Sequence, residues 1–187
     1  MPLHDEALNV EGGCNCGAVH YKVAIPALAQ RLPRPLAPAD APVPLPFIAL
    51  DHCNDCRRTT GSLLPALLCA PIDMCFVSLV AASSATLAPK ASAYKSSHER
   101  WRWFCSRCGI NIASTAVMPA GFPSMLDITL GSVRREYVDG EALVPERHLW
   151  WDYGVDWIQR LATEGYVTLP IHPDYRLTDT VTLRRPG

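Results

Sequence analysis

Two short cysteine motifs constrain the fold more than any other feature of the chain. Cys14 and Cys16 form a CxC pair, and Cys105 and Cys108 form a CxxC pair about ninety residues further along. Each pair is followed by a glycine, which can take the positive φ that a tight metal-binding turn requires. Four thiolates complete a closed tetrahedral zinc site. The sequence therefore predicts a structural zinc that ties the start of the chain to its middle.

Composition and charge indicate a single globular domain over residues 1–187. Hydrophobic residues make up 49% of the chain and charged residues 19%, and this length is sufficient for a hydrophobic core. The formal net charge of −1 gives no general attraction to nucleic acid or membrane. The first residues contain acids and no apolar run, and the apolar region 63–88 is broken by prolines and an aspartate. We expect a cytoplasmic protein with a small-molecule substrate and with neither a nucleic-acid nor a membrane partner; a homodimer is compatible with the sequence.

The cysteine usage favours reduced thiols and metal binding over disulfides. Six of the eight cysteines lie in CxC or CxxC pairs whose flanking residues are typical of metal ligands. The other two, Cys69 and Cys75, lie in apolar surroundings and are predicted to be buried structural thiols. A disulfide framework is the alternative.

The third cysteine pair differs from the other two. Cys53 and Cys56 are followed by Arg57 and Arg58, which would lower thiol pKa values and attract anions. On an extended strand Asp51 and Cys53 share one face, so these two side chains and Cys56 can converge on one metal. Three protein ligands with an open fourth position are the usual form of a catalytic zinc site. An unmetallated CxxC, either structural or redox-active, is the alternative.

Other polar side chains are candidates for the chemistry of this second site. Arg57 or Arg58 could hold a substrate carboxylate, although exposed salt bridging is the commoner role of such arginines. His52, Ser62 and His148 are candidates for proton transfer or hydrogen bonding. A structural role is the alternative for each histidine.

Short apolar runs separated by proline and glycine predict a mainly β fold. Residues 26–46 carry seven of the seventeen prolines and are predicted to be a surface loop or polyproline-like insertion, either passive or shaping the mouth of a pocket. Residues 150–164 suggest one short C-terminal helix that ends at Gly165. We expect strands over 18–25, 47–50, 96–104, 111–116 and 126–130, with two or three more between 63 and 95.

The order of these motifs resembles the glutathione-dependent formaldehyde-activating enzyme (GFA) family, which also includes the centromere protein V-like proteins. The resemblance covers roughly residues 10–160 and implies an Mss4-like β-tent of short antiparallel strands around a structural zinc. It assigns that zinc to the Cys14/Cys16 and Cys105/Cys108 motifs, and a second, catalytic zinc to a C-x-C-x-x-C segment. The matching pieces are 13–21, 53–62, 104–109, 126–132 and 145–150.

Family members of the best-known type are carbon–sulfur lyases that join formaldehyde to glutathione. The resemblance therefore implies a zinc-dependent lyase acting on glutathione or on a thiol adduct of a small carbonyl compound. The chain departs from the family pattern at Asp51, which stands where the C-x-C-x-x-C segment begins, and in the proline-rich insertion. A carboxylate in place of a thiolate should weaken zinc binding and make bound water more acidic. These departures favour a divergent biosynthetic relative.

Two other functions stay open from the sequence. One is a zinc-dependent hydrolase, dehydratase or isomerase that acts on a non-thiol metabolite through Asp51, Cys53 and Cys56. The other is a non-catalytic zinc module that binds a protein partner. Thiol dependence separates the lyase from the first alternative, and the number of bound metals separates both enzymes from the second.

Overall fold

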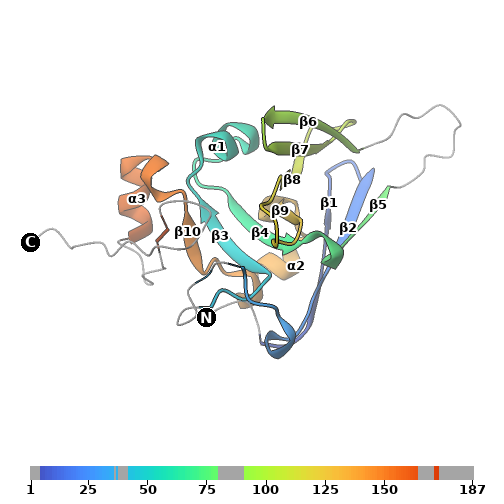
Figure 1. Ribbon diagram of the computed structural model, residues 1–187. Coiled ribbons are helices and arrows are strands. Elements are labelled where there is room, and N and C mark those ends of the chain that lie inside the picture. Colours follow the sequence, from blue (N-terminus) through green and yellow to red (C-terminus); the bar gives the residue numbers. More distant parts are fainter. Residues whose placement is uncertain (1–4, 36, 38–41, 80–90, 164–170, 173–187) are drawn as a thin grey trace, which may run out of the picture.

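A computed structural model describes residues 5–35, 37, 42–79, 91–163 and 171–172. Its strands form two sheets, a small one in the order β1-β2-β5 and a larger one in the order β10-β3-β4-β9-β8-β7-β6 (Figure 1). The strands are β1 (Leu8–Gly13), β2 (Val19–Ile25), β3 (Phe47–Asp51), β4 (Ala66–Pro71), β5 (Cys75–Leu79), β6 (Ala91–Ser97), β7 (Arg100–Cys105), β8 (Asn111–Ala116), β9 (Met125–Thr129) and β10 (Arg147–Leu149).

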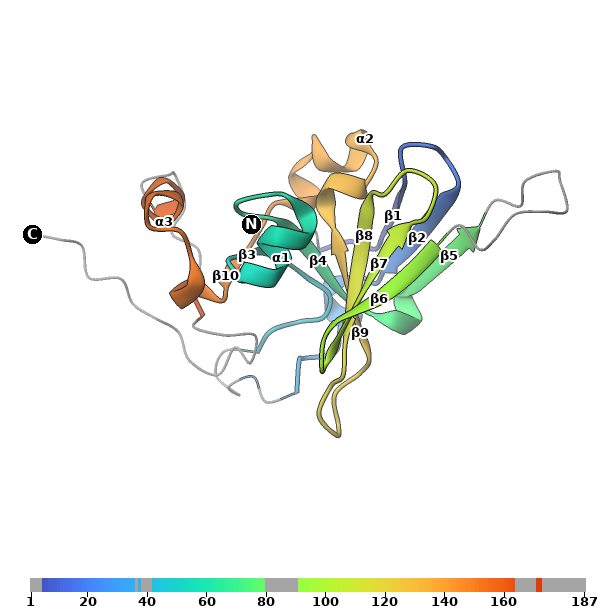
Figure 2. The ribbon, with the colours of Figure 1, turned by 90° about the horizontal axis from the view of Figure 1, so that it is seen from above.

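The helices are short and lie outside the two sheets. The longest described helix is α3, which is seen in two perpendicular views on the side of the molecule opposite the small sheet (Figures 1 and 2). The α-helices are α1 (Asn54–Thr60), α2 (Arg135–Val138) and α3 (Asp156–Thr163), and the 3₁₀ turns are η1 (Leu28–Gln30), η2 (Ile72–Met74), η3 (Leu130–Ser132), η4 (Glu141–Leu143) and η5 (Trp151–Tyr153).

The predicted fold class is confirmed, because short antiparallel strands dominate and one short helix lies near the C-terminal end of the described chain. One pairing differs from the expectation of antiparallel strands throughout. β10 runs parallel to β3, with Leu149 opposite Asp51. This pairing brings the end of β10 beside the start of the third cysteine motif.

The strands β3 and β4 of the larger sheet are buried on both faces, and their side chains alternate between them. Ile48 and Leu68 belong to the larger cluster of buried apolar residues, which extends into the small sheet. Phe47 and Leu67 belong to a smaller cluster on the opposite face. Asp51 is an even number of residues from Phe47 on the same strand and therefore shares its face.

Most predicted strands are present, but two stretches differ. The strands predicted over 18–25, 47–50, 111–116 and 126–130 correspond to β2, β3, β8 and β9. The strand predicted over 96–104 is wrong in its first part, because His98 and Glu99 form the turn between β6 and β7. β4 and β5 lie within the apolar region 63–95, of which residues 80–90 are outside the described residues.

The third cysteine motif forms a helix that the sequence analysis did not predict. The extended backbone predicted through Cys53 ends at Asp51, and Cys53 is instead the N-cap residue of α1. The helix ends at Gly61, which has a φ of 71°. The predicted C-terminal helix corresponds to α3, whereas its expected stop, Gly165, lies outside the described residues.

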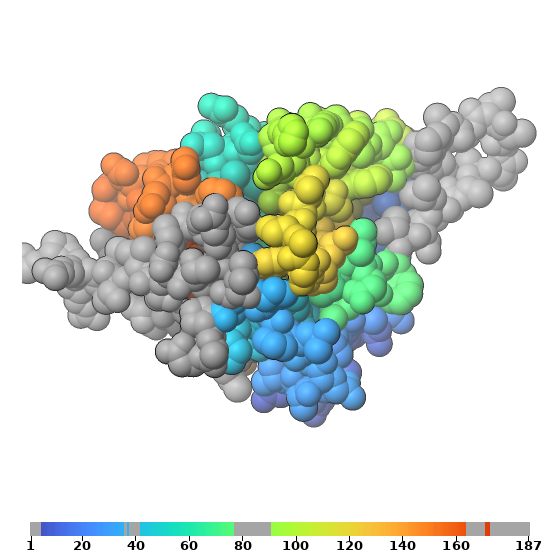
Figure 3. Space-filling view, viewed as in Figure 1, coloured from blue at the N-terminus to red at the C-terminus, as the bar shows by residue number. Residues whose placement is uncertain are grey.

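The proline-rich insertion is only partly a surface loop. Its two described arms pair through the backbone, with Arg34 N–H donating to the Val43 carbonyl at 2.7 Å and Leu45 N–H donating to the Leu32 carbonyl at 2.9 Å. Val43 and Leu45 are buried in the smaller apolar cluster. The space-filling view shows the region around residue 30 beside the β8–β9 loop (Figure 3). The insertion therefore builds part of the core on the face that carries Asp51.

All eight cysteines are free thiols, so no disulfide crosses the fold. Cys69 is buried, as predicted, and Cys75 is partly buried. Among the described helices, none has the length and apolar character needed to cross a membrane.

Candidate metal centres

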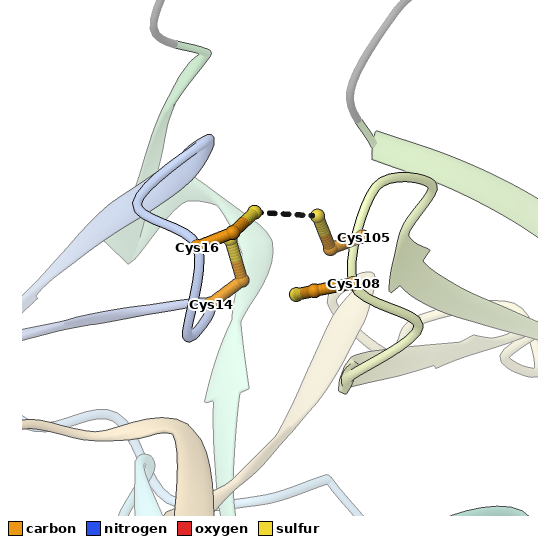
Figure 4. Close-up of side chains that lie close together, drawn as sticks. All are labelled: Cys14, Cys16, Cys105 and Cys108. Carbon is orange, nitrogen blue, oxygen red and sulfur yellow. Dashed lines mark hydrogen bonds between the residues drawn. The ribbon is translucent and has the colours of Figure 1, made fainter.

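The four cysteines of the first and last motifs meet at one point. Cys14 and Cys16 lie in the turn after β1, whereas Cys105 ends β7 and Cys108 lies in the turn that follows. Their sulfur atoms all lie within 4.8 Å of one another and face a common space (Figure 4). The Cys14–Cys16 and Cys16–Cys105 sulfur pairs are 3.5 and 3.7 Å apart. Four sulfurs around a zinc at 2.3 Å would be about 3.8 Å apart, so these distances suit one ion.

The backbone of these turns holds the sulfurs in place. Val19 N–H donates to the Cys14 sulfur at 3.3 Å, and Gly109 N–H donates to the Cys105 carbonyl at 2.8 Å. Gly17 and Gly109 have φ values of 69° and 76°, as the sequence analysis expected of the residues that follow each pair. The backbone N–H of Ile110 is the main cause that lowers the pKa of the Cys108 thiol to about 6. Cys108 is therefore favoured as a thiolate, the form of cysteine that binds metal, whereas burial and the neighbouring cysteines raise the pKa of Cys16 to about 11.

The second group consists of Asp51, Cys53 and Cys56. Their ligand atoms also lie within 4.8 Å of one another, and Asp51 and Cys56 are buried. The convergence comes from a strand that ends at Asp51 and a helix that begins immediately afterwards. Cys53 N–H donates to Asp51 Oδ1 at 2.8 Å, which fixes the carboxylate beside the helix N-terminus.

The three groups of this second cluster do not all ionise together in the absence of a cation. The neighbouring Cys56 side chain and the N-terminal amides of α1 lower the pKa of Cys53 to about 6. Hydrogen bonding from Cys53 and burial raise the pKa of Cys56, and burial raises the pKa of Asp51 to about 6. Only part of the cluster is therefore ionised near neutral pH without a cation. A divalent ion would stabilise all three anions together.

The second cluster opens into a cavity of about 250 Å³. Arg34, Arg100 and Arg102 supply cationic groups to its wall, and Asp127 pairs with Arg100 at 2.6 Å. The acids Asp55 and Glu99 line it from exposed positions. Its apolar lining comes from Phe47, Leu67, Cys69, Ala116, Val117, Met118, Met125, Leu149 and Trp150.

The arginine nearest the cluster is not one that the motif predicts. Arg102 on β7 donates from Nη1 to the Cys56 sulfur at 3.2 Å and from Nε to Ser96 Oγ at 3.1 Å. Arg57 points back along its own helix, with Nη2 3.4 Å from Asn54 Oδ1, and Arg58 is exposed. Neither Arg57 nor Arg58 lines the cavity. Their predicted role toward a substrate carboxylate is untested, whereas Arg102 lines the cavity.

The two candidate histidines form a buried pair behind the cavity. His52 Nε2 and His148 Nδ1 are 3.0 Å apart, and both rings pack edge-on against Trp151. Burial lowers the pKa of each histidine to about 4, with the neighbouring His148 adding to the effect on His52. Neither ring lines the cavity. Their contacts join β3 to β10 and favour the structural alternative given for them.

The third candidate, Ser62, lies away from this cavity. Its Oγ accepts a hydrogen bond from Leu64 N–H at 3.3 Å. It lines a separate depression with Thr60, Asn111 and Thr129. Its predicted catalytic role therefore has no support from its position relative to Asp51, Cys53 and Cys56.

The ligand sets of the two clusters suit two different kinds of metal site. Four sulfurs suit a closed zinc-type site, and two sulfurs with one carboxylate suit an ion that keeps a further position for another ligand. The predicted convergence within each group is confirmed by the positions of the atoms. Fold and sites together define a mainly β protein with two places able to hold a metal.

The chain belongs to the glutathione-dependent formaldehyde-activating enzyme family, whose model matches residues 42–153. The match includes Asp51, Cys53 and Cys56 and the Cys105–Cys108 half of the four-cysteine cluster. Cys14 and Cys16 precede the matched residues. The family resemblance inferred from the motifs is thus confirmed, although the match covers less of the chain than the motifs do.

A crystal structure of a protein from Rhodobacter sphaeroides is also similar to this chain. The identity is 19%, the similarity covers 70% of this chain and 95% of the other, and the TM-score is 0.40. None of the curated proteins matches the chain.

Proposed function

We propose that this protein is a zinc-dependent enzyme of the lyase type, which forms or breaks a carbon–sulfur bond between a thiol, such as glutathione, and a small carbonyl compound. The observation that carries the proposal is the cavity beside Asp51, Cys53 and Cys56 in a member of this enzyme family. A solely structural metal site would need no such opening. The departure at Asp51 favours a substrate other than formaldehyde, as in a divergent biosynthetic relative.

The proposal assigns one zinc to each cluster. Cys14, Cys16, Cys105 and Cys108 would hold the structural zinc, and Asp51, Cys53 and Cys56 would hold the catalytic one. When bound at the second cluster, zinc supplies Lewis acidity to a carbonyl oxygen or a thiol sulfur.

The reaction balances without an oxidant or a further co-reactant. In the forward direction the thiol sulfur forms a bond to the carbonyl carbon, and the carbonyl π electrons move to oxygen. The proton released by the thiol ends on that oxygen, and the reverse reaction returns it to sulfur.

The chain's own residues bind and orient the reacting groups in this scheme. Arg102 holds the Cys56 sulfur at 3.2 Å, and the Cys53 N–H holds the Asp51 carboxylate at 2.8 Å. The apolar wall formed by Phe47, Met125 and Leu149 limits the access of water to the adduct. The buried His52–His148 pair fixes the strand end from which Asp51 projects.

The test is a comparison of Cys53→Ala and Cys56→Ala with the wild type. Each variant should lose one zinc per chain and at least about a hundredfold of the activity toward thiol and carbonyl pairs, while it remains folded. Cys75→Ala is the matched control, because Cys75 lies outside both clusters. One zinc per chain in the wild type, unchanged in either variant, would leave a non-catalytic zinc module as the better description.

Asp51 favours a second candidate function. A carboxylate ligand is less electron-donating than a thiolate, so water activation becomes more favourable and a hydrolase, dehydratase or isomerase acting on a non-thiol metabolite gains support. Assays with and without a thiol distinguish this alternative from the lyase. Turnover of a carbonyl substrate at the same rate in the absence of any thiol would favour it.

A further inference from the structure

The cavity is lined by a cationic group whose hydrogen-bonding capacity is only partly used. Arg102 is 2% exposed, and its Nη2 atom is buried with no hydrogen-bond partner in the described structure. Its other two nitrogens are engaged by the Cys56 sulfur and by Ser96. A buried guanidinium nitrogen without a partner costs free energy, so its retention beside a cavity calls for an explanation.

The other cations of the cavity have partners already. Arg100 donates to Asp127 at 2.6 Å and to Ser114 at 2.9 Å. Arg34 lies over the Phe122 ring, with its guanidinium carbon 5.3 Å from the ring centre. Asp55 and Glu99 line the cavity from exposed positions, where solvent screens their repulsion of an anion. Arg102 is therefore the cation best placed to receive an anionic group next to the metal cluster.

The cavity wall also offers an apolar surface that includes a residue with an unusual backbone. Trp150 has a φ of 57° and a ψ of 39°, the left-handed region that a bulky side chain rarely adopts. This conformation follows directly after β10 and places Trp150 in the cavity wall with Met118 and Met125. Such backbone strain concentrates at functional sites, where it orients a side chain that the reaction needs.

We propose that the cavity binds a small carboxylate with an apolar body, whose carboxylate is received by Arg102 and whose body packs against Trp150. This inference deepens the proposed function, and it names the substrate class of the same site. A guanidinium can serve a sulfur and a carboxylate at once, because its donors point in fixed and separate directions. The carboxylate would then lie beside Cys56, and the reacting carbon would face the Asp51, Cys53 and Cys56 cluster.

The binding test uses phenylacetate and its neutral analogue phenylacetamide with the zinc-loaded, full-length protein. The two probes share an apolar body and differ in charge, so the ratio of their dissociation constants isolates the anion. Isothermal titration calorimetry should show phenylacetate binding roughly ten- to a hundredfold more tightly than phenylacetamide. Equal affinities in the wild type would overturn the inference without recourse to any variant.

Three variants assign that preference to residues. Arg102→Gln should bring the two affinities close together, whereas Arg160→Gln, which changes an exposed arginine on α3, should leave the ratio unchanged. Trp150→Gly keeps the left-handed backbone without strain. It should weaken the binding of both probes by a similar factor, about two- to tenfold. If folded Arg102→Gln protein keeps the wild-type ratio of the two dissociation constants, Arg102 is not the anion site.

Metal analysis of the same samples separates this inference from the proposed function. A preference for phenylacetate in protein that carries zinc only at the four-cysteine cluster would support the carboxylate site and contradict the proposed catalytic metal. Two zincs per chain with equal affinity for both probes would support the metal assignment and contradict the carboxylate site.

Discussion

The two cysteine clusters are built from the same chemical group, but they differ in how much of the chain they join. The four-cysteine cluster connects residues 89 positions apart, as in the Cys16–Cys105 pair. The three-ligand cluster takes all its members from one short segment, Asp51 to Cys56. A metal at the first cluster therefore closes a long loop of the chain, and a metal at the second closes almost none.

The surroundings of the two clusters also differ, because one is packed in the apolar core and the other lies beside a cavity. Cys14 and Cys105 belong to the larger apolar cluster, which packs between the two sheets. Asp51 lies on the opposite face of the larger sheet, beside a cavity and the Arg100–Asp127 ion pair. The two clusters therefore differ in loop length and in surroundings as well as in ligand type, and these are the differences that the proposed division into a structural and a catalytic site requires.

The largest effect is expected when the closed cluster loses a ligand. Cys108→Ala and Cys16→Ala should each release one metal and unfold the domain, because structural zinc contributes roughly 10 kcal/mol or more of folding free energy. Metal analysis and circular dichroism melting curves measure both effects. If either variant keeps wild-type metal content and melting temperature, the four-cysteine cluster does not hold a structural metal.

A smaller loss of stability is expected at the open cluster. Cys56→Ala should remove the second metal but change the free energy of unfolding by only about 1–3 kcal/mol, because the segment closes no long loop. Cys75→Ala provides the comparison for a thiol outside both clusters. Unfolding of Cys56→Ala as complete as that of Cys108→Ala would remove the distinction between the clusters.

Asp51→Cys should make the open cluster more like the closed one. A third thiolate should tighten zinc binding at this site by about tenfold or more, because soft sulfur ligands donate more charge to zinc than a carboxylate does. Competition with a chromophoric chelator measures the affinity. The same variant should gain activity with formaldehyde and glutathione, and an unchanged zinc affinity would show that Asp51 is not a ligand.

The smallest effects concern two glycines with a similar backbone, one at each cluster. Gly109 has a φ of 76° and Gly61 a φ of 71°, and a Cβ atom at either position would meet no other atom within 4 Å. Alanine should therefore destabilise the fold by about 1–2 kcal/mol at each position through backbone strain alone. Only Gly109→Ala should also weaken metal binding at the four-cysteine cluster, since Gly61 ends α1 after the last ligand. Equal zinc retention by both variants in chelator titrations would contradict that difference.

The sequence predicts the ligands of both clusters because their spacing is visible along the chain. CxC and CxxC pairs followed by glycine limit the geometry so strongly that Cys14 and Cys105 can be paired without a structure. The same reasoning reached Asp51, Cys53 and Cys56 but assumed an extended backbone, whereas Cys53 begins α1. The ligand spacing of this motif is a stronger sequence signal than the helical tendency of seven residues, so α1 was not predicted.

The remaining parts of the cavity could not be predicted, because they depend on strand pairing. Arg102 reaches Cys56, 46 residues earlier in the chain, because the fold brings α1 beside β7. Sequence proximity pointed instead to Arg57, whose side chain turns back to Asn54. Nothing in the sequence indicated the backbone conformation of Trp150, because tryptophan rarely adopts a left-handed φ. The burial of Val43 and Leu45 was not predicted, because the prolines around them indicated a surface loop.

Strand β7 has a consequence for the order in which the protein matures. It carries Cys105 for the closed cluster at its end and Arg102 for the open cluster two residues after its start. Pairing with β6 and β8 holds β7 along its length, and a metal bound at the proposed closed cluster would fix its end as well. Under the proposed assignment, capture of that metal would help to present Arg102 to Cys56. Metal loading would then be sequential in time, with the open cluster completed after the closed one.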